Sequence, residues 1–125
     1  MVTITPVRTG PISVLTVSGE IDLISGPRLR AALDEALDDR GADGRRAPSG
    51  VVVDLTGVSF LSSAGLAVLV EAHERASQQG IALKIVIDGA GSVARAFQAA
   101  AIHEHLDLHH TVRDALHEGD GRSAR

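Results

Sequence analysis

Hydrophobic and polar residues alternate at the start of the chain, in two runs that a short turn-like segment separates. The first run extends from Val2 to Pro6 and the second from Ile12 to Ser18, with Gly10 and Pro11 between them. Alternation with a period of two is typical of strands that bury one face, and Gly-Pro sequences mark turns. This part of the chain is therefore predicted to form a β-hairpin.

Helical and strand-like patterns alternate through the rest of the chain. Leucines recur about one helical turn apart at Leu29, Leu33 and Leu37, whereas 51–55 and 81–87 are mostly apolar runs that predict strands. The other predicted segments are a surface loop over 40–50, a helix from Ser63 to about Gln79, a helix from Ser92 through Ala101, an edge strand within 105–110 and a last helix capped by Thr111. A hairpin followed by helices that alternate with strands predicts an α/β domain with helices packed on one mixed sheet.

The composition indicates a globular protein with an aliphatic core. Of the 125 residues, 44% are hydrophobic, with two Phe and no Tyr, Trp or Cys. Few aromatic rings and a net charge of −4 argue against direct nucleic-acid binding, and the lack of cysteine excludes thiolate metal sites. Without a signal-peptide pattern or an apolar run of roughly 20 residues, we expect a cytoplasmic protein that does not bind membranes. We expect one domain over 1–118 and a flexible tail over 119–125.

Two adjacent serines, Ser62 and Ser63, lie between a strand-like run and the helix that follows it. A serine at the start of a helix commonly accepts a hydrogen bond from an unpaired amide, which stabilises the helix by about 1 kcal/mol. The same amides and the positive end of the helix dipole also favour a phosphate at this place. The sequence LSSAGL lacks the G-x-S-x-G pattern of a nucleophilic serine, so a catalytic role is disfavoured. A helix cap and a phosphorylation site both stay open.

The helix that starts at Ser63 is predicted to bury one side and expose the other. The inward residues are Leu66, Leu69, Val70, His73 and Ala76, and the outward residues are Ala64, Ala67, Val68, Glu71 and Arg75. Val68 is then an apolar residue on the exposed side, close to Ser63. A single exposed valine is ordinary, but beside small residues it also suits a flat docking surface. The pattern leaves both interpretations open.

Aspartates and histidines are the remaining candidate site residues. Asp22 follows a strand and Asp54 ends the VVVD strand, and at such places an aspartate commonly accepts hydrogen bonds from loop amides. Asp54 is assigned that role alone, whereas Asp22 is also expected near the start of the Ser63 helix. Five of the six histidines lie near the C-terminus: His103, His105, His109, His110 and His117. Their spacing matches no metal-binding motif, which favours a solvated surface over a metal site.

Four segments taken together resemble the STAS domain of anti-sigma factor antagonists. They are GEIDLISGPRLRAAL, VVVDLTGVSFLSSAGLAVLVEAHERA, GIALKIVIDGAGSVARAF and IHEHLDLHHTVRDAL. The resemblance covers about Val2 to Leu116 and rests mainly on the second segment. It implies a mixed sheet of four to five strands with helices mainly on one face, no enzymatic activity and no cofactor. It also implies a protein that binds an anti-sigma factor, often a serine kinase, and so releases a sigma factor.

The resemblance assigns the phosphorylated serine to Ser63. The family motif is Asp-Ser-Ser/Thr-Gly, and on LSSAGL its aspartate falls on Ser62, its acceptor on Ser63 and its glycine on Gly65. A second motif, Gly-Glu-hydrophobic-Asp, matches residues 19–22, and its aspartate lies close to the acceptor. The implied partner-binding residues are Asp22, Ser62, Ser63, Ala64, Gly65 and Val68. A phosphate on Ser63 would place like charges together beside Asp22 and oppose docking.

One position departs from the family pattern, because Ser62 stands where the motif has an acid. Recognition by a kinase that needs the carboxylate would be weakened, and Ser62 becomes a second candidate acceptor. The alternative function is a constitutive STAS scaffold in a transporter-associated or stress-signalling assembly that is never phosphorylated. The sequence names neither the sigma factor nor the kinase, and it leaves the oligomeric state open.

Overall fold

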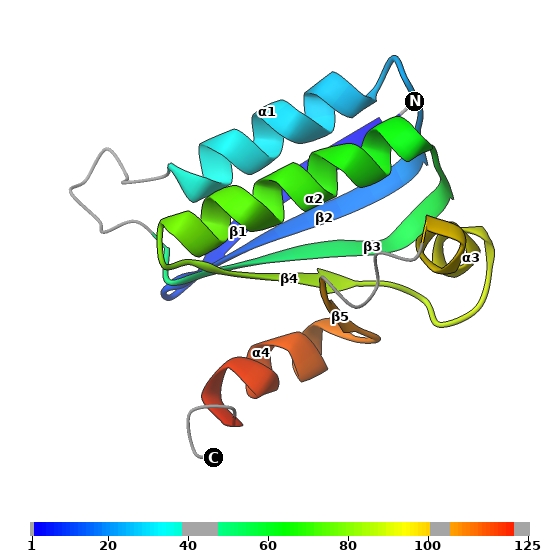
Figure 1. The fold of residues 1–125 in the computed structure, drawn as a ribbon. Helices are drawn as coiled ribbons and strands as arrows, with labels where there is room; N and C mark the ends of the chain where they lie inside the picture. Colours follow the sequence, from blue (N-terminus) through cyan, green and yellow to red (C-terminus); the bar gives the residue numbers. More distant parts are fainter. Residues whose placement is uncertain (1, 39–47, 101–105, 122–125) are drawn as a thin grey trace.

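The computed structural model describes residues 2–38, 48–100 and 106–121, with side chains described as far as residue 116. The elements follow one another as β1 (Val2–Thr9), β2 (Ile12–Ile21), α1 (Gly26–Leu37), β3 (Gly50–Leu61), α2 (Ser63–Gln78), β4 (Ala82–Val86), α3 (Ser92–Ala100), β5 (Asp107–His109) and α4 (Val112–Gly121). Figure 1 shows their arrangement around a central sheet.

The described strands form one mixed sheet in the order β1-β2-β3-β4-β5. β1 and β2 are antiparallel, which confirms the predicted hairpin, and each later pair of neighbours is parallel. The hairpin turn uses Gly10 with φ of 61°, a left-handed conformation that glycine adopts without the usual strain. Because β2, β3 and β4 run in the same direction, their carboxyl ends lie at one edge of the sheet.

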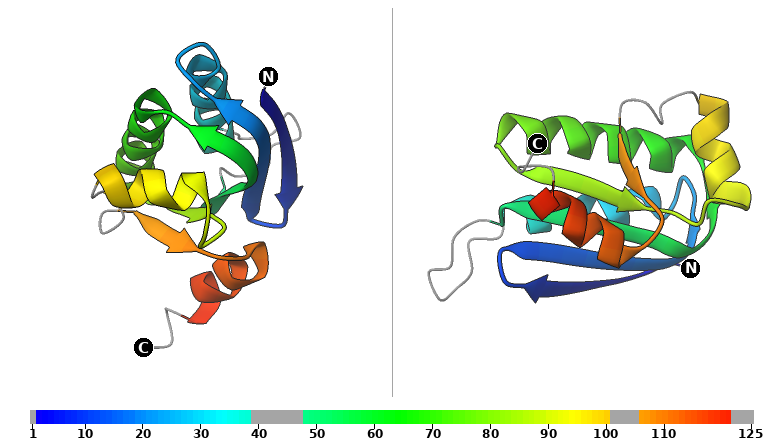
Figure 2. Two further views of the ribbon diagram at one scale, coloured as in Figure 1. Left: turned by 90° about the vertical axis from the view of Figure 1, so that its right-hand side faces the viewer. Right: turned by 90° about the horizontal axis from the view of Figure 1, so that it is seen from below.

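The helices cover the two faces of the sheet unequally. α1 and α2 lie side by side over one face, whereas α4 lies against the other (Figures 1 and 2). The larger core includes Leu33, Val53 and Leu69, all fully buried, and Phe97 of α3 belongs to the same core. The smaller core, under α4, consists of Val14, Val52, Val86 and Ala115. The prediction of a mixed sheet with helices mainly on one face is thus confirmed.

The hydrophobic pattern predicted the first half of β3 but not the second half. Val51, Val52 and Val53 are all buried because β3 has a core on each face, which is why the run is continuously apolar. The strand continues to Leu61, well beyond the predicted run of 51–55. Its pairing with β2 shifts register twice, at Thr16/Ser18 and Gly19/Glu20. Such irregularities break the alternation of side chains, so the second half of β3 has no strand-like period.

Several predicted helix ends also agree with the structure. Gly80, with φ of 74°, follows the end of α2, and the Thr111 hydroxyl accepts a hydrogen bond from the Asp114 amide at 2.9 Å. α4 continues to Gly121 and so includes the first residues of the segment that we expected as a tail. Ala101, most of the 40–50 loop and the end of the tail lie outside the described residues. None of the helices in the described ranges has the length and hydrophobicity that crossing a membrane requires.

Gly65 lies where α2 comes closest to the sheet. A Cβ atom placed on it would meet Cδ1 of Leu61 at 2.6 Å and Cγ2 of Ile21 at 2.8 Å. Both distances are shorter than carbon atoms tolerate without movement of the backbone or side chains. Only a residue without a side chain therefore lets the start of α2 pack against the ends of β2 and β3.

We expect Gly65→Ala to lower the free energy of unfolding by about 1–3 kcal/mol, because the added methyl group overpacks this contact. Urea unfolding followed by circular dichroism measures the change. Gly26→Ala is the matched control, since Gly26 is also near a helix start but has open space around its Cβ position. The control is expected to leave stability unchanged or raise it by about 0.4–1 kcal/mol. Equal effects of the two substitutions would contradict the close-packing role of Gly65.

Candidate functional site

The carboxyl ends of β2 and β3 bring the predicted site residues together. Ile21 and Leu61, the last residues of the two strands, are register partners. The Ser62 amide then donates a hydrogen bond to the Ile21 carbonyl oxygen at 2.9 Å. Asp22 follows directly after Ile21, and Ser63 follows Ser62, so the two predicted motifs meet at one end of the molecule. Figure 1 shows this end, where α1 and α2 both begin.

The two serines have different positions at the start of α2. Ser62 is the N-cap, with extended backbone angles of φ −79° and ψ 169°, and its hydroxyl accepts a hydrogen bond from the Gly65 amide at 3.3 Å. Ser63 is the first residue of the helix and is exposed. The cap interpretation is therefore confirmed for Ser62. The Ser63 side chain therefore lies at the surface, in the first turn of α2.

Asp22 holds the turn that connects β2 to α1. Its Oδ1 atom accepts hydrogen bonds from the Ile24 amide at 3.0 Å and from the Ser25 amide and hydroxyl, each at 2.9 Å. The hydrogen bonds from Ser25, followed by that from Ile24, hold the pKa of the Asp22 carboxyl below its usual range. Asp22 is therefore a negative charge at neutral pH. Asp54 has the local role predicted for it, because its Oδ1 accepts from the Thr56 amide and hydroxyl.

The predicted exposure of Val68 is wrong, because its side chain is only 6% exposed. The prediction assumed that α2 buries one side, but α2 packs against both the sheet and α1, so its buried sector is wider. The buried residues of α2 are Gly65, Leu66, Val68, Leu69, Ala72 and Ala76. Val70 and His73, which were predicted to point inward, are only partly buried. Val68 therefore does not contribute to the surface around Ser63, and Gly65 lies beneath that surface.

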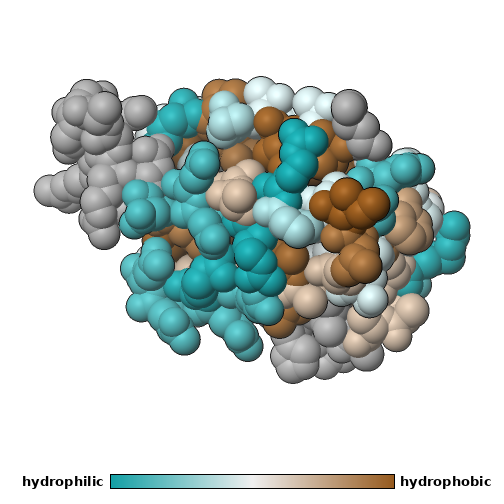
Figure 3. Space-filling model, turned by 90° about the horizontal axis from the view of Figure 1, so that it is seen from above, coloured by the Kyte–Doolittle hydropathy of each residue, from teal (hydrophilic) through white to brown (hydrophobic). Residues whose placement is uncertain are grey.

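The structure shows exposed apolar side chains near the carboxyl ends of β2 and β3 that the sequence patterns did not indicate. Leu23 is 78% exposed and Ile24 is 86% exposed in the β2–α1 turn, and Phe60 near the end of β3 is 48% exposed. Apolar residues also gather at this end of the helix-bearing face in Figure 3. The signal in the sequence was two branched apolar residues inside a segment whose neighbours, Asp22 and Gly26, are typical of a turn.

Two ion pairs join the exposed sides of α1 and α2. Arg30 pairs with Glu71, and Asp34 pairs with Arg75 one helical turn further along. The Arg30 guanidinium lowers the pKa of the Glu71 carboxyl through a hydrogen bond and its charge. Ion pairs this exposed contribute little to stability, but within each pair the arginine neutralises the charge of the carboxylate. Asp22, which follows the neighbouring strand end, is not a member of either pair.

The histidines do not assemble a metal site within the described residues. No group of three or more His, Cys, Asp or Glu side chains in the described ranges could hold a metal ion. His109 lies with Nε2 2.9 Å from Oδ1 of Asp107, and Nδ1 of His110 lies 3.4 Å from the Ile87 carbonyl oxygen. His103, His105 and the side chain of His117 lie outside the described residues.

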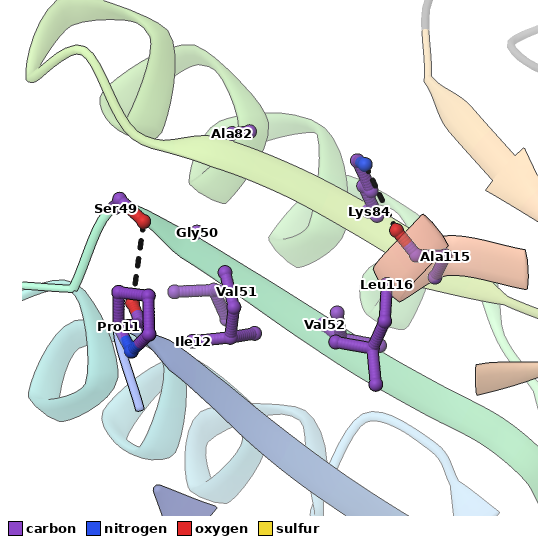
Figure 4. A pocket seen from close by; sticks show the side chains of 10 residues that line it. All are labelled: Pro11, Ile12, Ser49, Gly50, Val51, Val52, Ala82, Lys84, Ala115 and Leu116. Atoms are coloured by element: carbon purple, nitrogen blue, oxygen red, sulfur yellow. Dashed lines mark hydrogen bonds between the residues drawn. The ribbon is translucent and has the colours of Figure 1, made fainter. Parts of the chain in front are cut away.

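A cavity of about 490 Å³ lies on the opposite face of the sheet, beside α4. Its lining is mostly apolar (Figure 4) and comprises Pro11, Ile12, Ser49, Gly50, Val51, Val52, Ala82, Lys84, Ala115 and Leu116. The buried Lys84 amine donates a hydrogen bond to the Ala115 carbonyl oxygen at 2.9 Å, which connects β4 to α4. The cavity lies at the amino ends of β2, β3 and β4, whereas the serines follow the carboxyl end of β3. It is therefore separate from the serine site.

Comparisons with known proteins agree with this architecture. The family model described as STAS domain matches residues 3–115. The anti-sigma-F factor antagonist RsfB of Mycobacterium tuberculosis is 34% identical over 116 residues, which cover 92% of this chain and 87% of the relative. A putative anti-anti-sigma factor of the same species, Rv2638, is 31% identical over 117 residues, covering 94% of this chain and 75% of the relative.

A solved structure gives the same result at the level of the fold. The crystal structure of an anti-sigma factor antagonist from Mycobacterium paratuberculosis superposes with a TM-score of 0.81 and 28% sequence identity. The match covers 93% of this chain and 92% of the other. The family model, the relatives and the fold each cover nearly the whole chain, and the chain therefore belongs to the STAS domain family.

Proposed function

We propose that this protein is an anti-sigma factor antagonist. It binds an anti-sigma factor through the surface at the carboxyl ends of β2 and β3, and it thereby releases a sigma factor for transcription. Phosphorylation of Ser63 by that anti-sigma factor, acting as a serine kinase, switches the antagonist off. The observation that carries the proposal is the exposed Ser63 hydroxyl at the start of α2, at the strand end where Asp22 also lies. The identity of 34% to an anti-sigma-F factor antagonist supports the same function.

The proposed docking surface has Ser63 at its centre. Asp22, Ser62 and Ala64 surround it at the ends of the two strands, and Gly65 beneath it keeps the start of α2 close to the sheet. In the unmodified state this surface is small, largely uncharged and suited to close contact. A phosphate adds a charge of about −1.5 to −2 at neutral pH. Next to the ionised Asp22, that charge would have to be desolvated beside another negative group, which opposes docking.

Ser63 is the preferred phosphate acceptor of the two serines. Its hydroxyl is exposed, whereas Ser62 is partly buried and its hydroxyl is used in the cap hydrogen bond with Gly65. A phosphate on Ser63 would lie at the positive end of the α2 dipole, where helix amides and dipole favour an anion. The kinase then recognises its substrate without the acid that the family motif places at position 62.

We expect Ser63→Glu to weaken binding to the anti-sigma factor at least tenfold, because it places a permanent carboxylate beside Asp22. Isothermal titration calorimetry with the purified anti-sigma factor measures the change. Ser77→Glu is the matched control, because Ser77 is exposed on the same helix, roughly 21 Å further along its axis. That variant is expected to bind as the wild type does. If Ser63→Glu and Ser77→Glu bind equally well, Ser63 is not the switch.

Phosphorylation itself gives a second prediction. Incubation with ATP and the anti-sigma factor kinase is expected to add one phosphate to the wild type and to Ser62→Ala, and none to Ser63→Ala. Intact-mass spectrometry reads the result directly. Ser62→Ala removes the cap and is expected to cost about 1 kcal/mol of stability, so the incubation is run well below its unfolding temperature. A wild type that accepts no phosphate while still binding the partner would support the constitutive scaffold instead.

A further inference from the structure

The turn between β2 and α1 presents two large apolar side chains to solvent. Leu23 is 78% exposed and Ile24 is 86% exposed, more than any other large hydrophobic residue in the described ranges. A single exposed leucine is ordinary on a protein surface. Two adjacent branched side chains at the tip of a connecting turn, at the same end as an exposed serine, are a more specific arrangement. Adjoining apolar side chains of this kind mark interaction surfaces.

The turn that carries these side chains is held by an internal network of hydrogen bonds. The Ser25 hydroxyl accepts from the Asp22 amide and also lies 2.9 Å from both the Glu20 carbonyl oxygen and Oδ1 of Asp22. The Gly26 amide donates to the Asp22 carbonyl oxygen at 2.8 Å. Ser25 is buried, so this network lies inside the turn while Leu23 and Ile24 point outward. A turn fixed before binding loses little conformational freedom when a partner covers it.

The same turn is continuous with the proposed docking surface. Asp22 is adjacent to Leu23 in the chain, and the residue before it, Ile21, accepts the hydrogen bond from the Ser62 amide. The turn and the start of α2 thus occupy neighbouring strand ends. A protein that covers Ser63 closely enough to be repelled by a phosphate there also reaches the edge on which the β2–α1 turn lies.

We infer that Leu23 and Ile24 are the hydrophobic anchor of the interface with the anti-sigma factor. The inference rests on the proposed function, and it adds to it the chemistry that the partner must supply: an apolar pocket for two branched side chains, next to the place that receives Ser63. Most of the affinity of a protein interface commonly comes from a few residues that are fully covered on binding, and burial of exposed apolar side chains adds to it. The turn therefore provides affinity, and Ser63 provides the control by charge.

The partner fits this patch better than a second copy of the chain does. Continuity with the surface around Ser63 points to one occupant that covers both, and a copy of the chain would bring its own Asp22 and Ser63 into the contact. Two such copies meeting at this edge would place the two ionised Asp22 side chains in one interface, which like-charge repulsion disfavours. Self-association remains a distinct outcome of the experiment.

The test compares the Leu23→Ala/Ile24→Ala double variant with the wild type and with Val7→Ala. Val7 is the control, because it is 52% exposed on β1, outside the turn, and its replacement by alanine also removes exposed apolar atoms, although fewer of them. Each full-length protein is titrated by calorimetry with the purified serine-kinase anti-sigma factor that the wild type binds. The double variant is expected to bind about 10- to 100-fold more weakly, and Val7→Ala to bind as the wild type does.

Thermal unfolding and analytical ultracentrifugation of all three proteins complete the test. Because the side chains are exposed, the double variant is expected to keep the wild-type melting temperature within a few degrees, so a loss of binding is not a loss of fold. A double variant that binds like the wild type overturns the anchor but leaves the proposed function intact. A wild type that binds none of the anti-sigma factors encoded in its genome overturns the proposed function itself. A wild-type dimer that the double variant dissociates, with partner affinity unchanged, assigns the patch to self-association and overturns the anchor.

Discussion

The pairing of the last residues of β2 and β3 is the constraint on which the rest of the site depends. Ile21 and Leu61 are register partners, and the Ser62 amide adds one more hydrogen bond to the Ile21 carbonyl oxygen. That alignment brings two loops together that are forty residues apart in the chain. Gly65 then lets α2 start directly against both strands, because a larger residue would collide with the same Ile21 and Leu61 side chains. The backbone pairing of the two strands and the close packing of α2 therefore stabilise the same strand ends.

The segments that follow β2 and β3 have the same kind of internal arrangement. After β2, Asp22 and Ser25 use their side chains to fold the turn, and the apolar residues between them point outward. After β3, Ser62 caps the helix, and Ser63 is left at the surface. In each case a polar side chain satisfies backbone groups locally, while its neighbour stays exposed. Residues that maintain the structure and residues of the proposed docking surface thus alternate along each connection.

Sequence reasoning succeeded where local periodicity or side-chain chemistry decides the structure, and it failed where the number of elements around a helix or the shape of a turn decides. The hairpin, the buried run of β3 and the cap at Thr111 follow from local periodicity and chemistry. Val68 was misplaced because α2 is covered by α1 as well as by the sheet, and a hydrophobic period cannot distinguish one neighbour from two. Leu23 and Ile24 were missed because their exposure depends on the shape of a turn. The serine pair was found from its place between a strand and a helix, and resemblance then selected Ser63 as the acceptor. The structure added that Ser62 is the residue that caps the helix.

The serine at position 62 lowers the negative charge of the proposed docking surface in its unmodified state. With an acid at that place, the unmodified surface would carry two negative charges, and a partner would have to tolerate both. Ser62 leaves Asp22 as the only ionised group of the proposed docking residues. A phosphate of about −1.5 to −2 then more than doubles the negative charge of the surface in a single step. In the proposed switch, the neutral cap would therefore increase the difference in charge between the two states, because it lowers the charge of the unmodified surface and leaves the charge of the phosphate unchanged.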